Sequence, residues 1–542
     1  MTLTSRIARR VLRLRPPTNR ITIERDLKVP MPDGIVLLAD HYAPIAAEPR
    51  PTILVRTPFG RAGIRGLTSG RLVAERGYHV LLQSVRGTFG SGGDLHPARN
   101  DAADGRATIE WLATQKWFDG RLGTLGASYV GLTQWAIASD PPVPIRSMAI
   151  LVSGAKTQDF VYRGGSFSLE FSLGVVDLMA NQEKSVPAFL ASMVTSRRRL
   201  APLWNHLPLA DLDRLATGHS VPWFQDWLGH SEPGDPFWGA VDFRSGLAAS
   251  TAEFNLVGGW YDTFLPDLVA DYLELRRLGR RPRLLIGPWT HDQSLNAVSV
   301  NEVLDWIGQT LANGGGTDGR PAVRLLLGGS GQWLESDDWP PPADTATWYL
   351  QPNGGLSRQA PTSSEPDRYR YDPANPTPST NAGGAMRGNH PGLPKDNRAL
   401  EARPDVLVYS SDPLPVDMNI VGPVSASVFV RSSLPHTDFF ARLCDVDERG
   451  KSLNVSDGLI RLRPEPSAPA IRRILIDMWP TGHCFKRGHR LRVQISSGAH
   501  PRFARNLGSG EPLGTGTKLA VADQEIFHDP ERPSAVLLPV LR

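Results

Sequence analysis

Cysteine is almost absent from this sequence. Its 542 residues include two cysteines, Cys444 and Cys484. Two cysteines form at most one bridge, and these two lack the paired spacing of a zinc site or a redox motif. A disulfide scaffold and a cysteine-bound structural zinc are therefore excluded.

Long hydrophobic runs and an excess of one charge are also missing. No apolar stretch approaches the ~18–20 residues that cross a bilayer, and the N-terminus lacks the uninterrupted apolar segment of a secretory signal. The 59 Lys and Arg residues face 55 Asp and Glu residues, which leaves a formal net charge of +4. The sequence predicts a soluble, cytoplasmic protein without a transmembrane segment, and its charge does not call for a nucleic-acid partner.

Arginine is nonetheless concentrated in the first 17 residues. Apolar residues alternate with five arginines there, so that the segment is basic and weakly amphipathic. Two interpretations stay open: an arm that docks on or frays from the body, and an attachment to a membrane surface. The apolar residues are Ile7, Val11, Leu12 and Leu14.

The first third of the chain alternates between apolar runs and helix-like stretches. A hairpin is expected over residues 21–43, with Pro-Asp-Gly at 32–34 as its turn. The alternation that follows is typical of a parallel sheet covered by helices. The expected strands are 52–58, 78–85, 122–126 and 145–153, and the expected helices lie near 67–76, near 101–114 and after 126.

Strand signals disappear between about 157 and 244, where apolar residues recur at helical spacing. We therefore expect a helical insertion there. The α/β pattern then resumes and ends near 323–328, so the insertion interrupts one sheet. The resumed elements are a strand at 254–260, a helix at 266–278 and a strand at 283–289.

The last two hundred residues lack helical periodicity. Residues 337–402 are rich in Pro, Asn, Ser and Gly and predict an irregular connection without long helices. Short strand-like runs separated by turns follow, which is typical of a β-sandwich. With 542 residues, a chain of three or four domains is expected.

Ser128 stands at the apex of a predicted strand-to-helix turn. Within the segment GTLGASYVG (123–131), small residues lie around Ser128. A nucleophile elbow requires such residues because the backbone reverses sharply there. The second glycine is Gly131, whereas the motif G-x-S-x-G expects glycine at position 130. Taken alone, the motif fits both a catalytic serine and an ordinary turn.

Two later segments supply an acid and a histidine in the order that an α/β-hydrolase uses. Asp262 follows the strand that ends at Trp260, and His291 follows LLIGPW, so both are expected at the sheet edge that carries Ser128. His291 would take the Ser128 proton while Asp262 fixes its tautomer. The competing acids are Asp267 and Asp271, which fall at i, i+4 in the next helix and are expected on a solvated face.

Other motifs predict no cofactor and no metal. Residues 445–450 suggest a calcium loop but lack its closing Glu, so we expect a hairpin turn. The glycine-rich stretch at 87–93 lacks the Lys of a P-loop. The 13 histidines show no metal-ligand spacing.

The segments GASYVG, GGWYDTF and GPWTH resemble the cocaine-esterase and X-prolyl dipeptidyl-peptidase (CocE/NonD) family of serine α/β-hydrolases. The resemblance runs almost end to end and includes VRTPFG (55–60) and VRGTFGSGG (85–93). It implies that Ser128, Asp262 and His291 form a catalytic triad and that the Tyr129 N–H is an oxyanion donor.

The resemblance also implies an α/β-hydrolase domain with an inserted helical cap, followed by an all-β jelly roll. Combined with the patterns above, it predicts four segments. They are the first part of the hydrolase domain at 1–156, the cap at 157–244, the second part of the hydrolase domain at 245–345 and the jelly roll at 346–542.

Phe59 departs from the family, whose members usually carry Tyr there as the second oxyanion donor. Losing such a donor typically costs about 10²–10³ in kcat, which is too little to abolish catalysis. Gly60 would let the chain turn a backbone N–H toward Ser128 instead. Alternatively, Phe59 only lines the acyl pocket.

The expected function is cleavage of a carboxylic ester, or of an amide, through an acyl-enzyme. One alternative is an X-Pro dipeptidyl or acyl-peptide hydrolase, which needs cap carboxylates such as Glu170 or Asp177 to hold an α-ammonium group. Another is a catalytically silent ligand-binding homologue. The expected partner is a small ester or short acyl-peptide held by the cap, Phe59 and Phe264, while the oligomeric state stays open.

Overall fold

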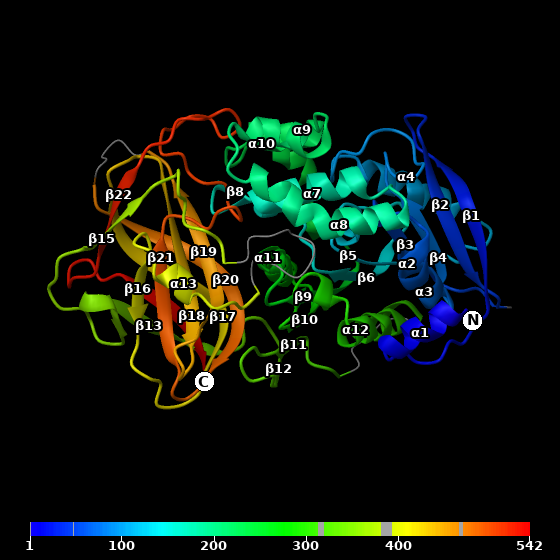
Figure 1. Cartoon of the computed structure of the whole chain (residues 1–542). Coiled ribbons are helices and arrows are strands. Elements are labelled where there is room, and N and C mark those ends of the chain that lie inside the picture. Colours follow the sequence, from blue (N-terminus) through cyan, green and yellow to red (C-terminus); the bar gives the residue numbers. More distant parts are fainter. Residues whose placement is uncertain (1, 47, 313–318, 381–392, 465–469) are drawn as a thin grey trace.

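The computed structural model describes residues 2–46, 48–312, 319–380, 393–464 and 470–542. Two large sheets lie side by side in these ranges (Figure 1). The helical insertion packs along the α/β part and against the second sheet (Figure 1). The predicted succession of an α/β part, a helical insertion and an all-β part is confirmed.

The first sheet has ten strands in the described residues, in the order β1-β2-β4-β3-β5-β6-β9-β10-β11-β12. Neighbours from β4 to β11 are parallel, and the pairs at both edges are antiparallel. The central strands are buried along their length because helices cover both faces. The strands are β1 (Ile21–Pro30), β2 (Val36–Pro44), β3 (Thr52–Thr57), β4 (His79–Ser84), β5 (Leu122–Ala127), β6 (Ile145–Leu151), β9 (Glu253–Gly259), β10 (Arg283–Gly287), β11 (Val323–Leu326) and β12 (Trp333–Ser336).

The predicted hairpin over 21–43 is confirmed as β1 and β2 at the sheet edge. Two other expectations need correction. The sheet continues beyond 323–328, because β12 adds an antiparallel edge strand. The helix expected near 67–76 is broken into α2 (Gly63–Arg65), a π-helical turn and α3 (Leu72–Ala74). Gly70 in that turn packs on Tyr42, whose ring would lie 2.7 Å from an added Cβ.

Three of the main helices of the α/β part, α4, α5 and α11, lie where the sequence predicted them, whereas α12 was not predicted. Apolar side chains from both sheet faces and these helices form the two largest cores of this part. Each helix follows a parallel strand and leads the chain back to the end of the sheet where the next parallel strand begins. The carboxyl ends of the parallel strands therefore all lie at the same end of the sheet. The helices are α4 (Asp101–Ala113), α5 (Tyr129–Trp135), α11 (Leu265–Arg277) and α12 (Ala297–Ile307).

The insertion is a helical cap with an aromatic core. Phe167, Trp204 and Phe224 are buried in this core, which also takes in Phe264 of the α/β part and Ala504 of the β-domain. The cap is therefore anchored to both neighbours. Its elements are α6 (Thr157–Val161), β7 (Tyr162–Arg163), β8 (Ser166–Phe167), α7 (Leu169–Asn181), α8 (Val186–Leu200), α9 (Leu212–Thr217) and α10 (Pro222–Gly229).

The all-β domain contradicts the irregular connection expected at 337–402. Strands β13, β14 and β15 lie in that segment, and β13 pairs from Ala343 to Tyr349 with β23, the last strand of the described residues. β13 begins at Ala343, so the predicted boundary at 345 falls inside this strand. The domain boundaries otherwise stay predictions. The strands are β13 (Ala343–Gln351), β14 (Gly355–Ser357), β15 (Asp367–Tyr371), β16 (Leu407–Ser410), β17 (Met418–Ser432), β18 (Thr437–Val446), β19 (Ser452–Leu462), β20 (Arg472–Phe485), β21 (Arg490–Ser496), β22 (Ala522–Phe527) and β23 (Ala535–Leu541), with the short helix α13 (Arg398–Glu401) before β16.

The basic N-terminal segment forms a helix, α1 (Leu3–Val11), that lies on the α/β part. Ser5 is buried, and its hydroxyl donates a hydrogen bond to Glu75. Thr2 caps the helix by accepting the Ser5 N–H at 3.2 Å. The segment is therefore docked on the body rather than frayed from it. A helix long and apolar enough to cross a membrane does not occur in the described residues.

Candidate active site

Ser128 stands between β5 and α5 in a strained backbone conformation. Its φ is 61° and its ψ is −127°, which a residue with a side chain rarely adopts. The Ser128 N–H donates to the Leu151 carbonyl at 2.9 Å, and its own carbonyl accepts the Gly131 N–H at 2.8 Å. These bonds hold a sharp turn with Ser128 at its apex.

Two glycines let this turn pack closely. A Cβ on Gly126 would lie 2.1 Å from Val130, and a Cβ on Gly131 would lie 2.5 Å from Ser153. Val130 thus occupies the place that G-x-S-x-G gives to glycine, while glycine is needed one residue later, where α5 passes the end of β6. The shifted spacing follows from that close approach.

Asp262 and His291 follow two adjacent parallel strands. Gly259 of β9 pairs with Gly287 of β10, so the loops after them leave the sheet side by side. His291 Nδ1 lies 2.6 Å from Asp262 Oδ2. Asp262 is fully buried, and its second oxygen accepts the Phe264 N–H at 2.8 Å. The carboxylate is therefore fixed on the imidazole.

The pKa of His291 is raised above its ordinary value. Burial alone would lower it, because burial disfavours the charged imidazolium, but the charge and hydrogen bond of Asp262, together with the charge of Asp292, outweigh burial. A histidine held in this way is suited to accept a proton at its other nitrogen.

Ser128 and His291 line the same small cavity, of about 70 Å³. Phe59, Tyr129 and Phe264 also line it, so the structure brings these five predicted residues together. Asp262 lies behind His291, outside the lining. The remaining lining residues are Pro97, Leu132, Ser153, Thr157, Phe160, Phe171, Val175, Leu178, Met179, Trp227 and Thr263.

The oxyanion side of the cavity contains Tyr129 and Phe59. Tyr129 is the first residue of α5, where a backbone N–H has no acceptor within the helix. The Tyr129 phenol donates a hydrogen bond to Asp101 Oδ2 at 3.0 Å. Of the groups of Tyr129, the backbone N–H is therefore the candidate oxyanion donor. The Phe59 N–H donates to Thr57 Oγ1 at 3.0 Å. Gly60 does not line the cavity; its φ is 80°, and Phe89 packs where a Cβ on residue 60 would lie.

Comparisons with known proteins give the family of this chain. Residues 33–293 match the X-Pro dipeptidyl-peptidase (S15 family), and residues 315–537 match the X-Pro dipeptidyl-peptidase C-terminal non-catalytic domain. The cocaine esterase of Rhodococcus sp. (strain MB1 Bresler) is 30% identical over 96% of this chain and 99% of its own length. The chain belongs to the CocE/NonD family. It is a serine hydrolase.

Solved structures support the α/β-hydrolase fold of this CocE/NonD member. An α-amino acid ester hydrolase has a TM-score of 0.80 and 23% identity, and the match covers 97% of this chain and 98% of that one. An aminopeptidase from the marine sediment archaeon Thaumarchaeota archaeon has a TM-score of 0.79 and 21% identity, with 96% and 97% covered. At these identities the likeness concerns the fold alone.

The two competing acids are not on a solvated face, as the sequence suggested. Asp267 and Asp271 are buried. Asp267 pairs with Arg163 of the cap, and Asp271 Oδ1 lies 2.7 Å from the Arg244 guanidinium. The helical spacing predicted their common face but not the arginines that cover it. Both acids tie the cap to α11, away from His291.

The two cap carboxylates proposed for an α-ammonium group do not line the cavity of this CocE/NonD member. Asp177 binds Arg199 at 2.6 Å and the Ser196 hydroxyl at 2.7 Å. Glu170 is buried at the start of α7, where its N–H donates to the Pro501 carbonyl. Neither carboxylate belongs to the lining, which contains no Asp or Glu in the part of the chain that is described.

Sequence reasoning missed several residues of the cavity. Ser153 follows β6 at the same sheet edge as Ser128, and the residue before it, Val152, has a φ of 43°. A strand end beside the elbow could have indicated Ser153. The cap residues Phe160, Phe171 and Trp227 could not be assigned in this way, because their side chains meet only in the folded cap.

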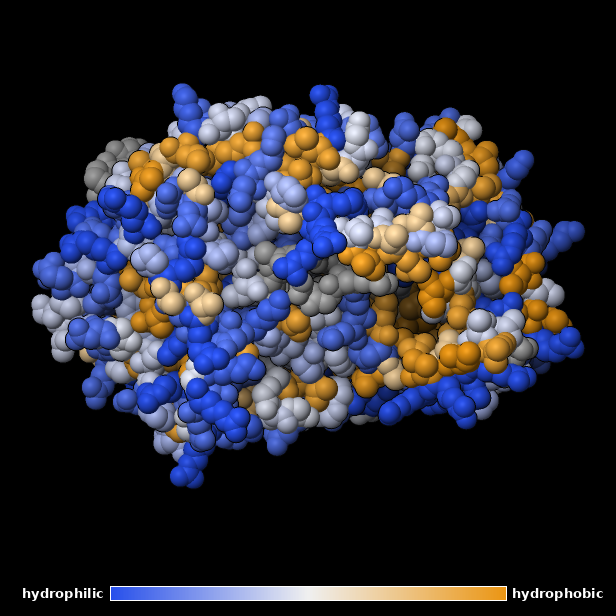
Figure 2. Space-filling view, in the orientation of Figure 1, coloured by the Kyte–Doolittle hydropathy of each residue, from blue (hydrophilic) through white to orange (hydrophobic). Residues whose placement is uncertain are grey.

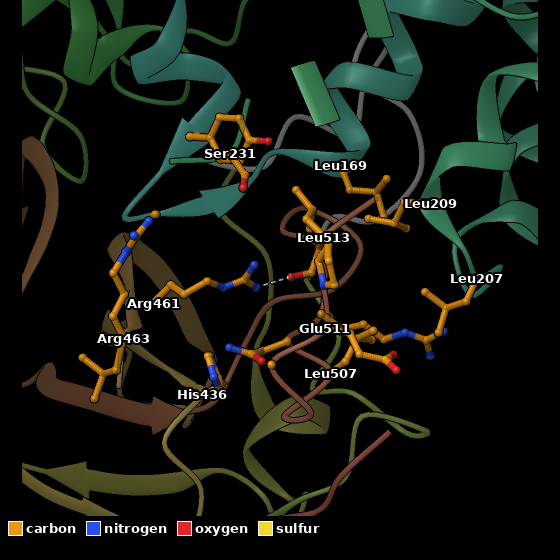
Figure 3. A pocket seen from close by; sticks show the side chains of 18 of the residues that line it. Leu169, Leu207, Leu209, Ser231, His436, Arg461, Arg463, Leu507, Glu511 and Leu513 are labelled. Atoms are coloured by element: carbon orange, nitrogen blue, oxygen red, sulfur yellow. Dashed lines mark hydrogen bonds between the residues drawn. The ribbon is translucent and has the colours of Figure 1, made fainter. Parts of the chain in front are cut away.

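A larger cavity of about 660 Å³ lies at the joint between the cap and the β-domain (Figure 3). Arg461, Arg463 and Glu511 bring charge to its wall, and leucines of both the cap and the β-domain form its apolar part (Figure 3). None of the three predicted triad residues lines it.

The described residues contain no group of three His, Cys, Asp or Glu side chains able to hold a metal ion. The turn at 447–450 joins β18 to β19, and Asp447 accepts the N–H groups of Arg449 and Lys451. The predicted hairpin turn is confirmed there. Both cysteines are buried and free.

Proposed function

We propose that this serine hydrolase is a carboxylesterase that cleaves esters of uncharged, apolar acyl groups through an acyl-enzyme on Ser128. The observation that carries the proposal is the cavity at Ser128 and His291, whose wall is aromatic and aliphatic and has no carboxylate among the described residues. Such a wall accepts an apolar acyl group and offers no counter-charge to an ammonium group.

In this mechanism, Ser128 Oγ attacks the ester carbonyl carbon while His291 Nε2 takes the serine proton. Asp262 keeps the other imidazole proton on Nδ1 and stabilises the imidazolium. When the tetrahedral intermediate collapses, His291 returns the proton to the alcohol that leaves. A water molecule then repeats the sequence on the acyl-enzyme and releases the acid.

The cap carboxylates favour an esterase over an X-Pro dipeptidyl-peptidase, because they do not face the cavity. A peptidase of that kind needs a carboxylate facing the substrate α-ammonium group. Asp177 is buried and already bound by Arg199 and the Ser196 hydroxyl, so its carboxylate is not free to receive an ammonium group. The relative named cocaine esterase supports the same choice.

A substrate panel tests the proposal. We expect p-nitrophenyl butyrate and p-nitrophenyl benzoate to be hydrolysed with kcat/KM at least a hundredfold above that for aminoacyl-prolyl p-nitroanilides. Preferential cleavage of the prolyl anilides would contradict the esterase. Absence of turnover on every substrate, together with no labelling by a fluorophosphonate, would favour the silent ligand-binding homologue.

The pH profile should show an acid limb above pH 6.5. Only the neutral imidazole accepts the Ser128 proton, and Asp262 raises the pKa of His291 above its ordinary 6.5. Activity is therefore low while His291 is protonated and rises as the pH passes its pKa. The measurement is kcat/KM for p-nitrophenyl butyrate from pH 5 to 9. A limb centred below pH 6 would contradict this assignment of the base.

Phe59→Tyr should raise kcat about tenfold, equivalent to about 1.4 kcal/mol of transition-state stabilisation. Phe59 lines the cavity beside Ser128, and its own N–H is bonded to Thr57, so an added phenol would supply a second donor to the oxyanion. A donor that acts mainly in the transition state changes kcat more than KM. An unchanged kcat would leave Phe59 as a pocket residue only.

A further inference from the structure

Helix α1 carries a stripe of apolar side chains that the fold leaves uncovered. Leu3, Ile7 and Val11 follow each other at i, i+4 and i+8, and each is at least 56% exposed. This spacing places them on one face of the helix. The helix itself is held to the body through buried Ser5 and Glu75. The exposed stripe is thus a fixed part of the surface.

Helix α8 of the cap repeats this pattern. Val186, Leu190 and Val194 have the same spacing and are 44% to 73% exposed. The helix is tied to α7 from its other side, because Ser196 and Arg199 bind Asp177. We call the six residues of α1 and α8 the two-helix face. Single exposed apolar residues are common, but two regular stripes mark an interaction surface.

The two stripes lie on one side of the molecule. Figure 2 shows hydrophobic surface over α8 and over α1, with a hollow between them. Strongly hydrophilic residues border the stripe of α1, which is the lower of the two in this view (Figure 2). A single partner surface can therefore reach both helices.

The borders of the two-helix face are cationic. Neither α1 nor α8 contains an acidic residue. In the ranges that the structure describes, no ion pair joins a carboxylate to any of five arginines on or directly after these helices. The five arginines are Arg6, Arg10, Arg13, Arg197 and Arg198.

An apolar face with cationic borders fits an anionic lipid surface. Amphipathic helices of this composition lie in the interface plane with their apolar side at the headgroup boundary. Each arginine near an anionic leaflet adds electrostatic attraction. A second copy of the chain fits less well, because a two-fold pairing through the same patch would set the arginines of one copy against those of the other.

We propose that the two-helix face docks the enzyme onto membranes that contain anionic phospholipid. The apolar stripes enter the headgroup region, and the arginines contact the lipid phosphates. Docking would hold the enzyme where apolar esters accumulate, but it rests on no part of the catalytic assignment.

Vesicle co-sedimentation of the full chain tests the proposal. We expect the protein to sediment with vesicles of phosphatidylglycerol and phosphatidylcholine. It should bind at least tenfold less to phosphatidylcholine alone, and at least tenfold less in 0.5 M NaCl, because salt screens the arginines. Ser128→Ala should sediment like the wild type, which separates docking from catalysis.

Variants in the stripes locate the docking surface. Ile7→Ser with Val11→Ser, and Leu190→Ser with Val194→Ser, should each reduce the bound fraction at least tenfold. The matched control is Val416→Ser with Leu475→Ser, which alters two exposed apolar residues of the β-domain, 65% and 53% exposed. The control should bind like the wild type. All three variants should keep the wild-type melting temperature.

Three results would overturn the proposal. The wild type could stay in the supernatant with anionic vesicles. The stripe variants could bind as well as the control. Light scattering could instead show that the stripe variants dissociate an oligomer that does not bind vesicles, which would assign the face to a second copy of the chain.

Discussion

Ser128→Ala should lower kcat for p-nitrophenyl butyrate by about 10⁴- to 10⁶-fold. The residual rate of such variants comes from transition-state binding alone, since the covalent route is lost. Ser128 is placed at the apex of the turn by backbone hydrogen bonds and not by its side chain. Alanine keeps the Cβ and hence the same backbone conformation, so the fold should be retained.

Two measurements accompany the Ser128→Ala assay. The melting temperature should change by no more than a few degrees, and labelling by a fluorophosphonate should disappear. Ser153→Ala is the matched control, because Ser153 lines the same cavity but does not stand at the elbow. It should retain labelling and most activity. If Ser153→Ala abolished labelling and Ser128→Ala did not, the nucleophile would be wrongly assigned.

The three triad residues could be predicted from the sequence because each follows a strand of the parallel sheet. Ser128, Asp262 and His291 each follow a buried strand, and the carboxyl ends of parallel strands meet at one edge. The sequence therefore indicated which side chains would be neighbours. It also indicated the strained turn, since the small residues before Ser128 and the nearby Gly131 are typical of a backbone that reverses sharply there.

The wall of the cavity could not be predicted because it is assembled by tertiary packing. Phe171 and Trp227 come from separate cap helices whose apolar positions fit either a core or a pocket. Burial of Asp267 was also missed, because its partner Arg163 lies more than a hundred residues earlier. Helical periodicity reports that a face is polar, but it does not report which element covers that face.

Strand β13 was missed for a related reason. Its sequence, ADTATWYLQ, lies between proline-rich stretches that predict turns. The strand forms because β23, almost two hundred residues later, supplies its hydrogen-bonding partner. Strand pairing of this kind depends on context more than on local propensity.

Asp262→Asn should lower kcat about 10⁴-fold while KM and folding change little. Asparagine can still accept the Phe264 N–H, so the loop keeps its shape. Its amide, however, would donate to His291 Nδ1 and move the imidazole proton to Nε2, which then cannot accept the Ser128 proton. The loss of the negative charge should also lower the pKa of His291 and move the acid limb of the pH profile downward.

Asp267→Asn provides the comparison that identifies the catalytic acid. Asp267 is as deeply buried as Asp262, but it pairs with Arg163 of the cap and not with His291. The substitution leaves Arg163, whose side chain is 12% exposed, without its anionic partner, so the melting temperature should fall. The acid limb of the pH profile should stay in place, because the charge next to His291 is unchanged. A downward shift of the limb in Asp267→Asn, with no shift in Asp262→Asn, would mean that the wrong aspartate is assigned to the triad.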